Sequence, residues 1–218
     1  TIKKFTKQKN NVKIVIFATG ISARRSTNYK NSPSYEIDNK TNQKMNKQII
    51  SLRKDAKNAA KILGVTDIEF LDFPDNEMDL VSNLQITKAI EKIIKKFKPD
   101  QVFTHTNFDV NVDHRALYNA TLTATRPKKG SKIKKVFAFE IPSSTEWYFP
   151  TQFSPNVFID ISNEIKTKIQ ALSKYKTELE DFPHPRSKDA IHSISKKWGS
   201  VSGFNNAEAF YLVREISK

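Results

Sequence analysis

The sequence predicts an α/β protein with a mostly parallel sheet that carries helices on both faces. Two patterns support this class. Short runs of β-branched and other apolar residues alternate with longer segments whose apolar residues recur at helical spacing. Glycine and proline residues punctuate these segments at the places where turns are expected. Because 38% of the 218 residues are apolar, we expect one folded domain that spans 1–218.

Each predicted element has its own local signal. The run at 12–18 is rich in Val and Ile and stops before Gly20, which is typical of a buried parallel strand. The helix predicted at 49–63 stops at Gly64, a residue suited to the position after a helix. The next helix begins near Leu84 and ends near Pro99. The other predicted strands cover 68–71, 101–104, 136–139 and 157–159. The other predicted helices cover 115–124, 163–179 and 188–197, a long polar loop covers 22–39, and a last element covers 207–216.

This alternation of strands and helices indicates a Rossmann-like three-layer sandwich. The chain has no cysteine, so a metal site here has to use histidine and carboxylate ligands. No signal core is present at the N-terminus, and no apolar run approaches the roughly 18 residues of a membrane span. We therefore expect a soluble protein in the cytoplasm. The sequence does not predict an oligomeric state.

The formal charge of +14 raises the possibility of a nucleic-acid partner. Of the 37 basic residues 7 are arginine, which leaves 30 lysines, and these are spread along the chain. Basic runs such as 128–135 are typical of solvated turns. We therefore expect no specific binding of nucleic acid, and only weak, salt-sensitive contacts.

The segment 104–115 concentrates chemically active side chains directly after a predicted strand. His105, Asp109, Asp113 and His114 all lie on this strand-to-helix loop. Ligands of open α/β sheets bind at the carboxyl ends of the strands, where such loops meet. An imidazole with a neighbouring carboxylate is common in metal sites, so His114 is a candidate ligand. Two simpler interpretations stay open: Asp113 caps the helix, and His105 is a structural residue.

Four segments resemble the PIG-L/LmbE-like de-N-acetylases: Val-Ile-Phe-Ala-Thr-Gly at 15–20, Ala-Ala-Lys-Ile-Leu-Gly-Val at 59–65, Phe-Leu-Asp-Phe-Pro-Asp at 70–75 and Asn-Val-Asp-His-Arg at 111–115. The resemblance extends over nearly the whole chain. It implies a Rossmann-like fold, zinc as the cofactor, and hydrolysis of the N-acetyl group of an amino sugar or its conjugate. The products are acetate and a free amine, and the implied partner is a small amino-sugar substrate.

The resemblance also implies roles for individual residues. His114 matches a zinc-binding histidine, and Asp113 matches the acidic catalytic-site residue before it. Asn111 stands where some members carry a histidine that assists the tetrahedral intermediate; an amide can donate a hydrogen bond there but cannot transfer a proton. The family's substrate-binding arginine falls one position before Arg53. The candidate substrate contacts are Arg53, Asp75, Asp109, Glu146, Trp147 and Arg186.

One family motif is missing from the sequence. His-Pro-Asp-Asp-Glu, which follows the first strand in the family and supplies further zinc ligands and the general base, does not occur. Residues 1–5 instead resemble the helix after that motif. Removing a first strand would leave strand edges unpaired in the middle of the sheet. We therefore expect an N-terminally incomplete member that is inactive by itself. The alternative is a catalytically inactive, sugar-binding relative that has lost the metal site.

Overall fold

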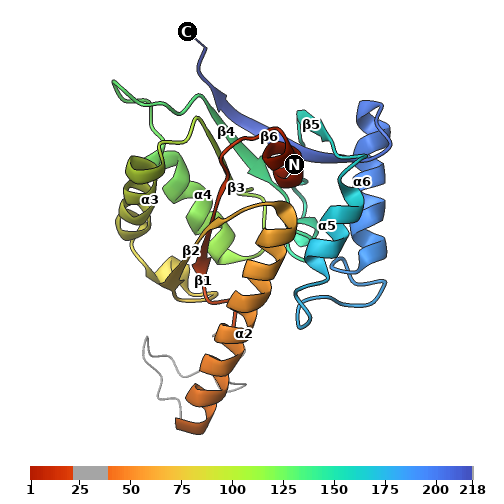
Figure 1. Ribbon diagram of the computed structural model, residues 1–218. Helices are drawn as coiled ribbons and strands as arrows, with labels where there is room; N and C mark the ends of the chain where they lie inside the picture. Colours follow the sequence, from red (N-terminus) through yellow and green to blue (C-terminus); the bar gives the residue numbers. More distant parts are fainter. Residues whose placement is uncertain (22–38, 218) are drawn as a thin grey trace.

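The computed structural model, which describes residues 1–21 and 39–217, has strands in the middle and helices on either side (Figure 1). Helices α3 and α4 lie on one side of the strands, and α5 and α6 lie on the other. Helix α2 packs against α5. The helices are α1 (Ile2–Lys7), α2 (Asn39–Leu63), α3 (Asn83–Phe97), α4 (Val112–Ala124), α5 (Ile165–Leu172) and α6 (Lys188–Ser202), with short 3-10 turns η2 (Met78–Leu80) and η3 (Thr145–Trp147). The strands are β1 (Lys13–Ala18), β2 (Asp67–Phe73), β3 (Gln101–His105), β4 (Lys135–Phe139), β5 (Val157–Asp160) and β6 (Ala207–Glu215).

The described strands form two separate hydrogen-bonded groups. Strands β1 and β2 pair in parallel, and the other four have the order β3-β4-β6-β5. Strand β4 is parallel to β3, whereas β6 is antiparallel to both of its neighbours, β4 and β5. Strands β3, β4 and β5 therefore share one direction, and β1 runs the same way (Figure 1). The predicted α/β class with a mostly parallel sheet is confirmed.

Local signals explain where two of the helices begin and end. The side chains of Ser82 and Ser187 accept hydrogen bonds from backbone N–H groups at the starts of α3 and α6. Helix α3 ends at Lys98, whose backbone is left-handed with φ of 55°, directly before Pro99. Helix α6 ends at Gly203, with φ of 78°.

The helices predicted at 49–63 and 163–179 have different lengths in the structure. The helix predicted at 163–179 is the shorter α5, because after Ser173 the backbone N–H groups of Lys174 and Tyr175 bond carbonyls three residues back and the chain enters turns. Helix α2 begins ten residues before the predicted start, at Asn39. The loop predicted at 22–39 otherwise falls outside the described residues. The last element, at 207–216, is strand β6.

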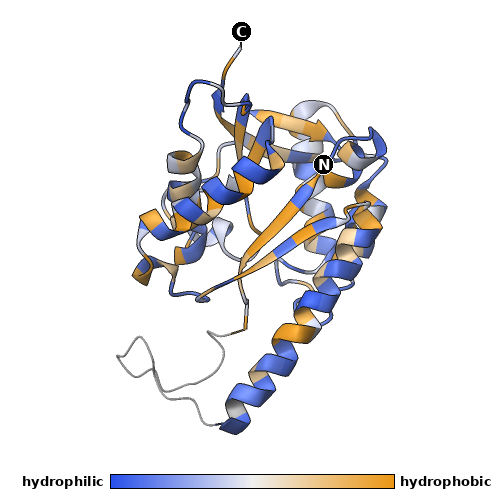
Figure 2. Cartoon of the chain, turned by 60° about the vertical axis from the view of Figure 1, so that its left-hand side comes forward, coloured by the Kyte–Doolittle hydropathy of each residue, from blue (hydrophilic) through white to orange (hydrophobic). Residues whose placement is uncertain are grey.

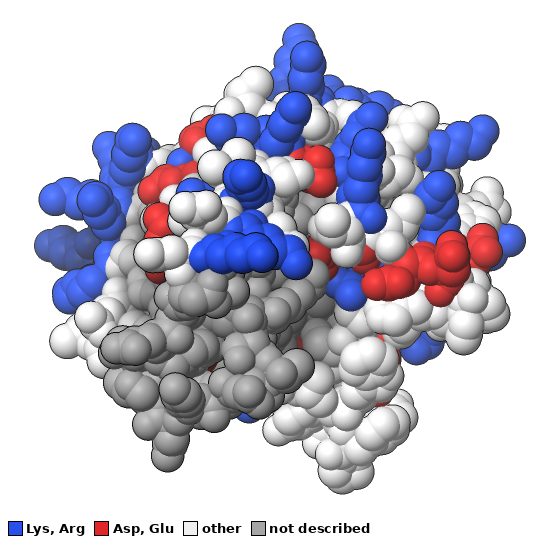
Figure 3. All heavy atoms as spheres, turned by 90° about the horizontal axis from the view of Figure 1, so that it is seen from below, with Lys and Arg blue, Asp and Glu red and all other residues white. Residues whose placement is uncertain are grey.

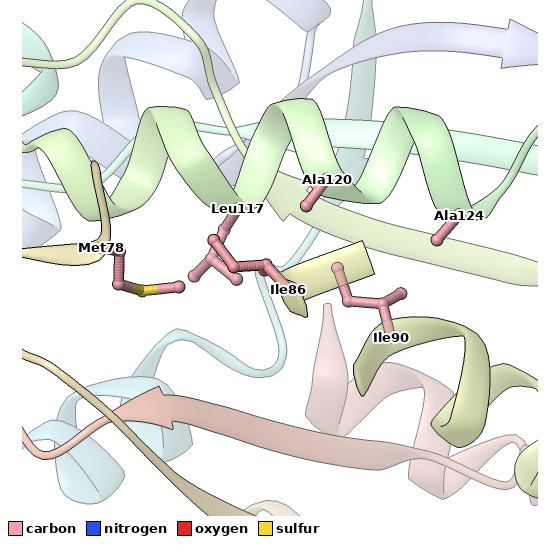
Figure 4. Close-up of a cluster of buried hydrophobic side chains, with 6 residues drawn as sticks. All are labelled: Met78, Ile86, Ile90, Leu117, Ala120 and Ala124. Carbon is pink, nitrogen blue, oxygen red and sulfur yellow. The ribbon is translucent and has the colours of Figure 1, made fainter. Parts of the chain in front are cut away.

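A cluster of buried side chains joins η2, α3 and α4 (Figure 4). Met78 and Ala120 are completely buried, and Ile86 is 1% exposed. This packing fixes the start of α4 against the loop that follows β2, and the start of α4 carries the residues of the candidate site. The cluster consists of Met78, Ile86, Ile90, Leu117, Ala120 and Ala124.

The surface is rich in charge. Lysine and arginine side chains are spread over the face shown in Figure 3, with acidic side chains between them. Hydrophobic residues, by contrast, concentrate in the strands (Figure 2). The helices within the described ranges are too short or too polar to cross a membrane.

Candidate functional site

The candidate site lies where the loops after β3 and β4 meet. These strands are parallel neighbours with His105 opposite Phe139, so both loops leave the same edge of the sheet. Backbone hydrogen bonds join the loops: Thr106 N–H donates to the Phe139 carbonyl at 2.9 Å. The sequence 104–115 is thus placed at a carboxyl-end edge, as predicted.

Asp109 is the buried centre of this site. Its side chain is 0% exposed, and both carboxylate oxygens accept hydrogen bonds. Oδ1 accepts from the Asn111 backbone N–H at 2.8 Å, and Oδ2 accepts from the hydroxyls of Ser144 at 2.9 Å and Thr145 at 2.8 Å. The carboxylate therefore connects the two loops. A buried charge is tolerated here because donors surround it.

His114 is held by Asp109. Its Nδ1 lies 3.1 Å from Asp109 Oδ1, and its ring stacks on that of His105 with centroids 4.3 Å apart and planes 6° apart. With Nδ1–H donated to the carboxylate, the lone pair of the imidazole is on Nε2. A carboxylate that orients an imidazole in this way is typical of metal-binding histidines.

His105 forms the floor beneath the His114 ring. Burial, together with the neighbouring His114, lowers the pKa of His105 to about 3, while Asp109 opposes the shift. His105 is therefore a neutral ring at physiological pH. Its ring stacks on His114, which supports the interpretation of His105 as a structural residue.

Asp113 points toward the loop after β2. Its Oδ2 accepts from the backbone N–H of Asn76 at 2.7 Å, and its Oδ1 accepts from that of Met78 at 3.0 Å. The capping residue of α4 is Asn111, whose side chain accepts from the Asp113 N–H at 2.8 Å. The alternative interpretation of Asp113 as the helix cap is therefore wrong, because α4 already begins at Val112, two residues before the start that a cap at Asp113 requires.

The two aspartates have opposite pKa shifts. Burial alone raises the pKa of Asp109, but the contacts with His114 and the surrounding donors outweigh it and hold this pKa below the ordinary value. Burial raises the pKa of Asp113, against the two backbone N–H groups that lower it, and nearby Asp75 adds to the rise.

Ser144 and Thr145 were not predicted as site residues. Besides its bond to Asp109, Ser144 Oγ lies 3.4 Å from His114 Nδ1. The Glu146 carboxylate accepts from the backbone N–H groups of Ser143 and Ser144, which fixes the turn that carries them. One signal in the sequence could have found these two residues. The polar run 143–146 follows β4, and because β4 is the parallel neighbour of β3, the loops after the two strands lie together.

The remaining predicted residues have varied surroundings. Arg53 forms an ion pair with Asp72 and lies over the Phe70 ring at 5.4 Å, so its contacts are with β2. Asp75 is buried near Asp113. Trp147 is 49% exposed on η3.

Arg186 is the last predicted substrate contact. Its Nη1 lies 2.6 Å from Glu178 Oε2 in an ion pair. Its Nε is buried and has no hydrogen-bond partner in the structure. The charge of Arg186 is therefore paired with a carboxylate, while its buried Nε–H has no acceptor.

The residues present fit one zinc ligand and not a complete site. His114 offers Nε2, with the orienting carboxylate that such a ligand needs. Within residues 1–21 and 39–217, however, no three His, Asp or Glu side chains gather closely enough to hold a metal ion. Asp109 and Asp113 both use their oxygens for protein donors.

Comparisons with known proteins agree on one family. The family model described as PIG-L, GlcNAc-PI de-N-acetylase, matches residues 1–125. "Uncharacterized deacetylase YaiS" of Escherichia coli (strain K12) is 34% identical over 135 residues, which cover 59% of this chain and 67% of the relative. Diacetylchitobiose deacetylase of Thermococcus kodakarensis is 25% identical over 178 residues, 77% of this chain and 65% of the relative. The match thus spans about two thirds of the length of each relative.

A solved structure shows the same fold. N,N'-diacetylchitobiose deacetylase of Pyrococcus horikoshii superposes with a TM-score of 0.72 at 19% identity, covering 98% of this chain and 76% of that one. The family model accounts for more than half of the residues, including the loop with Asp109 and His114. This chain therefore belongs to the PIG-L family.

Proposed function

We propose that the full-length protein is a metal-dependent deacetylase that hydrolyses the N-acetyl group of an amino sugar or its conjugate, with release of acetate and a free amine. Family membership and the names of the relatives support deacetylation. The observation that carries the proposal for this chain is the His114–Asp109 pair at the carboxyl end of β3, with Nε2 left as the available ring nitrogen.

In this proposal His114 is one zinc ligand, and the others come from outside the described residues. A bound zinc would supply a water of lowered pKa for attack on the amide carbonyl. Asp109 holds the imidazole in the tautomer that presents Nε2. Asn111 uses Oδ1 to cap α4, which leaves its Nδ2 hydrogens to stabilise a developing oxyanion.

Asp113 is proposed as a positioning residue. Its carboxylate is bonded to the Asn76 and Met78 backbone, so it fixes the loop after β2 beside the start of α4. That loop also carries Asp75, which we propose as a contact for sugar hydroxyls. Trp147, with half of its surface exposed, is proposed to stack on a sugar face.

The other proposed substrate contacts lie outside the cluster of Asp109, His114, Ser144 and Thr145. Glu146 shapes the turn that carries Trp147. Arg53 and Arg186 are proposed to meet anionic groups of a larger conjugate, although each already has a carboxylate partner. A cytoplasmic location stays a prediction.

The test measures zinc content and acetate release of the purified full-length protein. We expect about one zinc per chain, sharply reduced together with acetate release in His114→Ala. His192→Ala on α6, half-buried and outside this cluster, is the matched control and is expected to retain both. Full zinc occupancy in His114→Ala contradicts the assignment. A wild-type protein that binds N-acetylglucosamine but holds no zinc and releases no acetate supports the inactive relative instead.

A further inference from the structure

The hydroxyl of Thr145 has a hydrogen-bond direction that its surroundings fix. Thr145 is 4% exposed, and its Oγ1 lies 2.7 Å from the backbone nitrogen of Ile141 and 2.8 Å from Asp109 Oδ2. A backbone N–H only donates, and an ionised carboxylate only accepts. Thr145 Oγ1 therefore accepts from Ile141 and gives its single hydrogen to Asp109.

The hydroxyl of Ser144 is not fixed in this way. Its Oγ lies 2.9 Å from Asp109 Oδ2, 3.4 Å from His114 Nδ1 and 3.4 Å from the carbonyl oxygen of Ile141. A hydroxyl carries one hydrogen, so Ser144 serves one of these acceptors at a time. Of the two hydroxyls that reach Asp109, that of Thr145 is a fixed donor and that of Ser144 is an exchangeable one.

Two hydrogen-bond arrangements therefore compete around the ring of His114. In the first, Nδ1–H donates to Asp109 Oδ1 at 3.1 Å and the lone pair of the ring is on Nε2. In the second, the Ser144 hydroxyl donates to Nδ1, so the ring proton is on Nε2. Only the first arrangement leaves Nε2 available, and it depends on the Asp109 carboxylate staying beside Nδ1.

The Asp109 carboxylate keeps its place because donors hold both of its oxygens. Oδ1 accepts from the backbone N–H of Asn111 at 2.8 Å, and Oδ2 accepts from the two hydroxyls. Without the Thr145 hydroxyl, Oδ2 would depend on Ser144 alone, and Ser144 could turn to His114 Nδ1 instead. The fixed donor therefore holds the carboxylate whichever acceptor Ser144 serves.

The turn that carries Thr145 is itself held by several hydrogen bonds. The backbone N–H groups of Ser144 and Thr145 donate to the carbonyl of Ile141 at 3.2 and 3.0 Å. Those of Ser143 and Ser144 donate to the carboxylate of Glu146. The bonds within residues 141–146 therefore fix where the Thr145 hydroxyl lies before it meets Asp109.

We propose that Thr145 is a positioning residue of the deacetylase site. Its hydroxyl holds the Asp109 carboxylate so that the ring proton of His114 stays on Nδ1, and Ser144 is the donor that competes for this nitrogen. The inference rests on the proposed function for its effect on acetate release. The tautomer of His114, by contrast, is measured without metal or substrate.

Nitrogen NMR of the histidine rings reads the tautomer in the full-length protein, freed of metal with a chelator, at about pH 8, where an ordinary imidazole is neutral. His184 is an internal reference for a proton on Nε2, because its Nδ1 accepts from the Arg186 backbone N–H at 3.1 Å. We expect His114 to carry its proton on Nδ1. Thr145→Val keeps the side-chain shape but loses a hydrogen bond to a charged group, and is expected to shift the tautomer ratio about 10-fold or more toward Nε2–H, so that both forms are visible.

Three further variants separate positioning from a general loss of structure. Thr145→Ser keeps the hydroxyl and is expected to keep the wild-type tautomer and acetate release. Ser144→Ala removes the competing donor and is expected to keep the proton of His114 on Nδ1. Thr125→Val is the matched control, because Thr125 is 1% exposed at the other end of α4 and its hydroxyl bonds the Thr121 carbonyl. This control is expected to match the wild type in tautomer and kinetics.

Acetate release by the metal-loaded protein gives the second measurement. Thr145→Val is expected to lower kcat about 10-fold or more, as for other partners that orient a metal-binding histidine. KM is expected to change less than about twofold, because the substrate contacts remain. A single Nδ1–H tautomer in Thr145→Val overturns the proposal. So does a shift toward Nε2–H in Ser144→Ala, or a Thr145→Ser variant that behaves like Thr145→Val. A wild-type protein that releases no acetate contradicts the proposed function and leaves the tautomer result to decide on Thr145.

Discussion

Replacing Asp113 by asparagine tests whether this carboxylate is an anchor for the loop after β2. The folded protein directs two backbone N–H groups, those of Asn76 and Met78, at its two oxygens. Asparagine keeps the volume but offers one acceptor, so one N–H faces an amide donor. A donor left unpaired in the interior costs about 1–3 kcal/mol. We therefore expect Asp113→Asn to lower the free energy of unfolding by about 2 kcal/mol, or the melting temperature by about 4–8 °C for a chain of this size.

The assay is urea unfolding at neutral pH, followed by the fluorescence of the two tryptophans. Asp79→Asn is the matched control, because Asp79 lies in η2 beside Met78 but is exposed. Its effect on stability is expected to stay within about 0.5 kcal/mol. Equal stability of the two variants would refute the anchoring role. If Asp113→Asn lost acetate release at unchanged stability, the carboxylate would act in the chemistry directly.

Substitutions at three further positions test other parts of the structure. Asn111→Ala removes the helix cap and is expected to cost about 1 kcal/mol in urea unfolding, whereas Asn111→Asp keeps the acceptor and the stability but loses the amide donor, so acetate release falls. Burial raises the pKa of Glu140, so the folded state is most stable below the ordinary glutamate pKa and loses stability as the pH rises through the raised value. Glu140→Gln, which keeps an acceptor for Trp198 Nε1, is expected to flatten the change in unfolding free energy between about pH 4 and about pH 7; an unchanged slope would contradict this. A Cβ on Gly199 would lie 2.5 Å from the backbone oxygen of Phe204, so Gly199→Ala is expected to lower stability by about 1–3 kcal/mol, and an unchanged melting curve would contradict the close approach.

The sequence predicted the fold better than the detailed site. Strands and helices with strong periodicity, such as β3 and α3, appear within a few residues of their predicted bounds. Their patterns reflect burial on a fixed face, which is a local property of the chain. The end of α5 was missed because the backbone after Ser173 changes to hydrogen bonds with carbonyls three residues back, and apolar spacing carries no information on that change.

The sequence identified the segment that carries the site, but not the contacts between its side chains. Asp109 and His114 are five positions apart, and their pairing follows from the loop and first turn between them. Ser144 and Thr145 complete the same cluster from 35 residues away, through the pairing of β3 with β4. Sequence spacing cannot show which loops meet unless the strand order is known. The capping alternative for Asp113 also depended on where α4 begins, and in the structure the cap is Asn111.

The side chains in and around the turn η3 fall into two groups, one buried against the site and one exposed to solvent. On its inner side Ser144 and Thr145 hold Asp109, and through it the His114 ring. On its outer side Trp147 and Phe149 face solvent at 49% and 76% exposure. Substitutions on the outer side therefore alter what the protein surface touches while the imidazole stays in place. Within residues 144–149 the chain thus passes from side chains that hold the imidazole in place to side chains that only meet solvent.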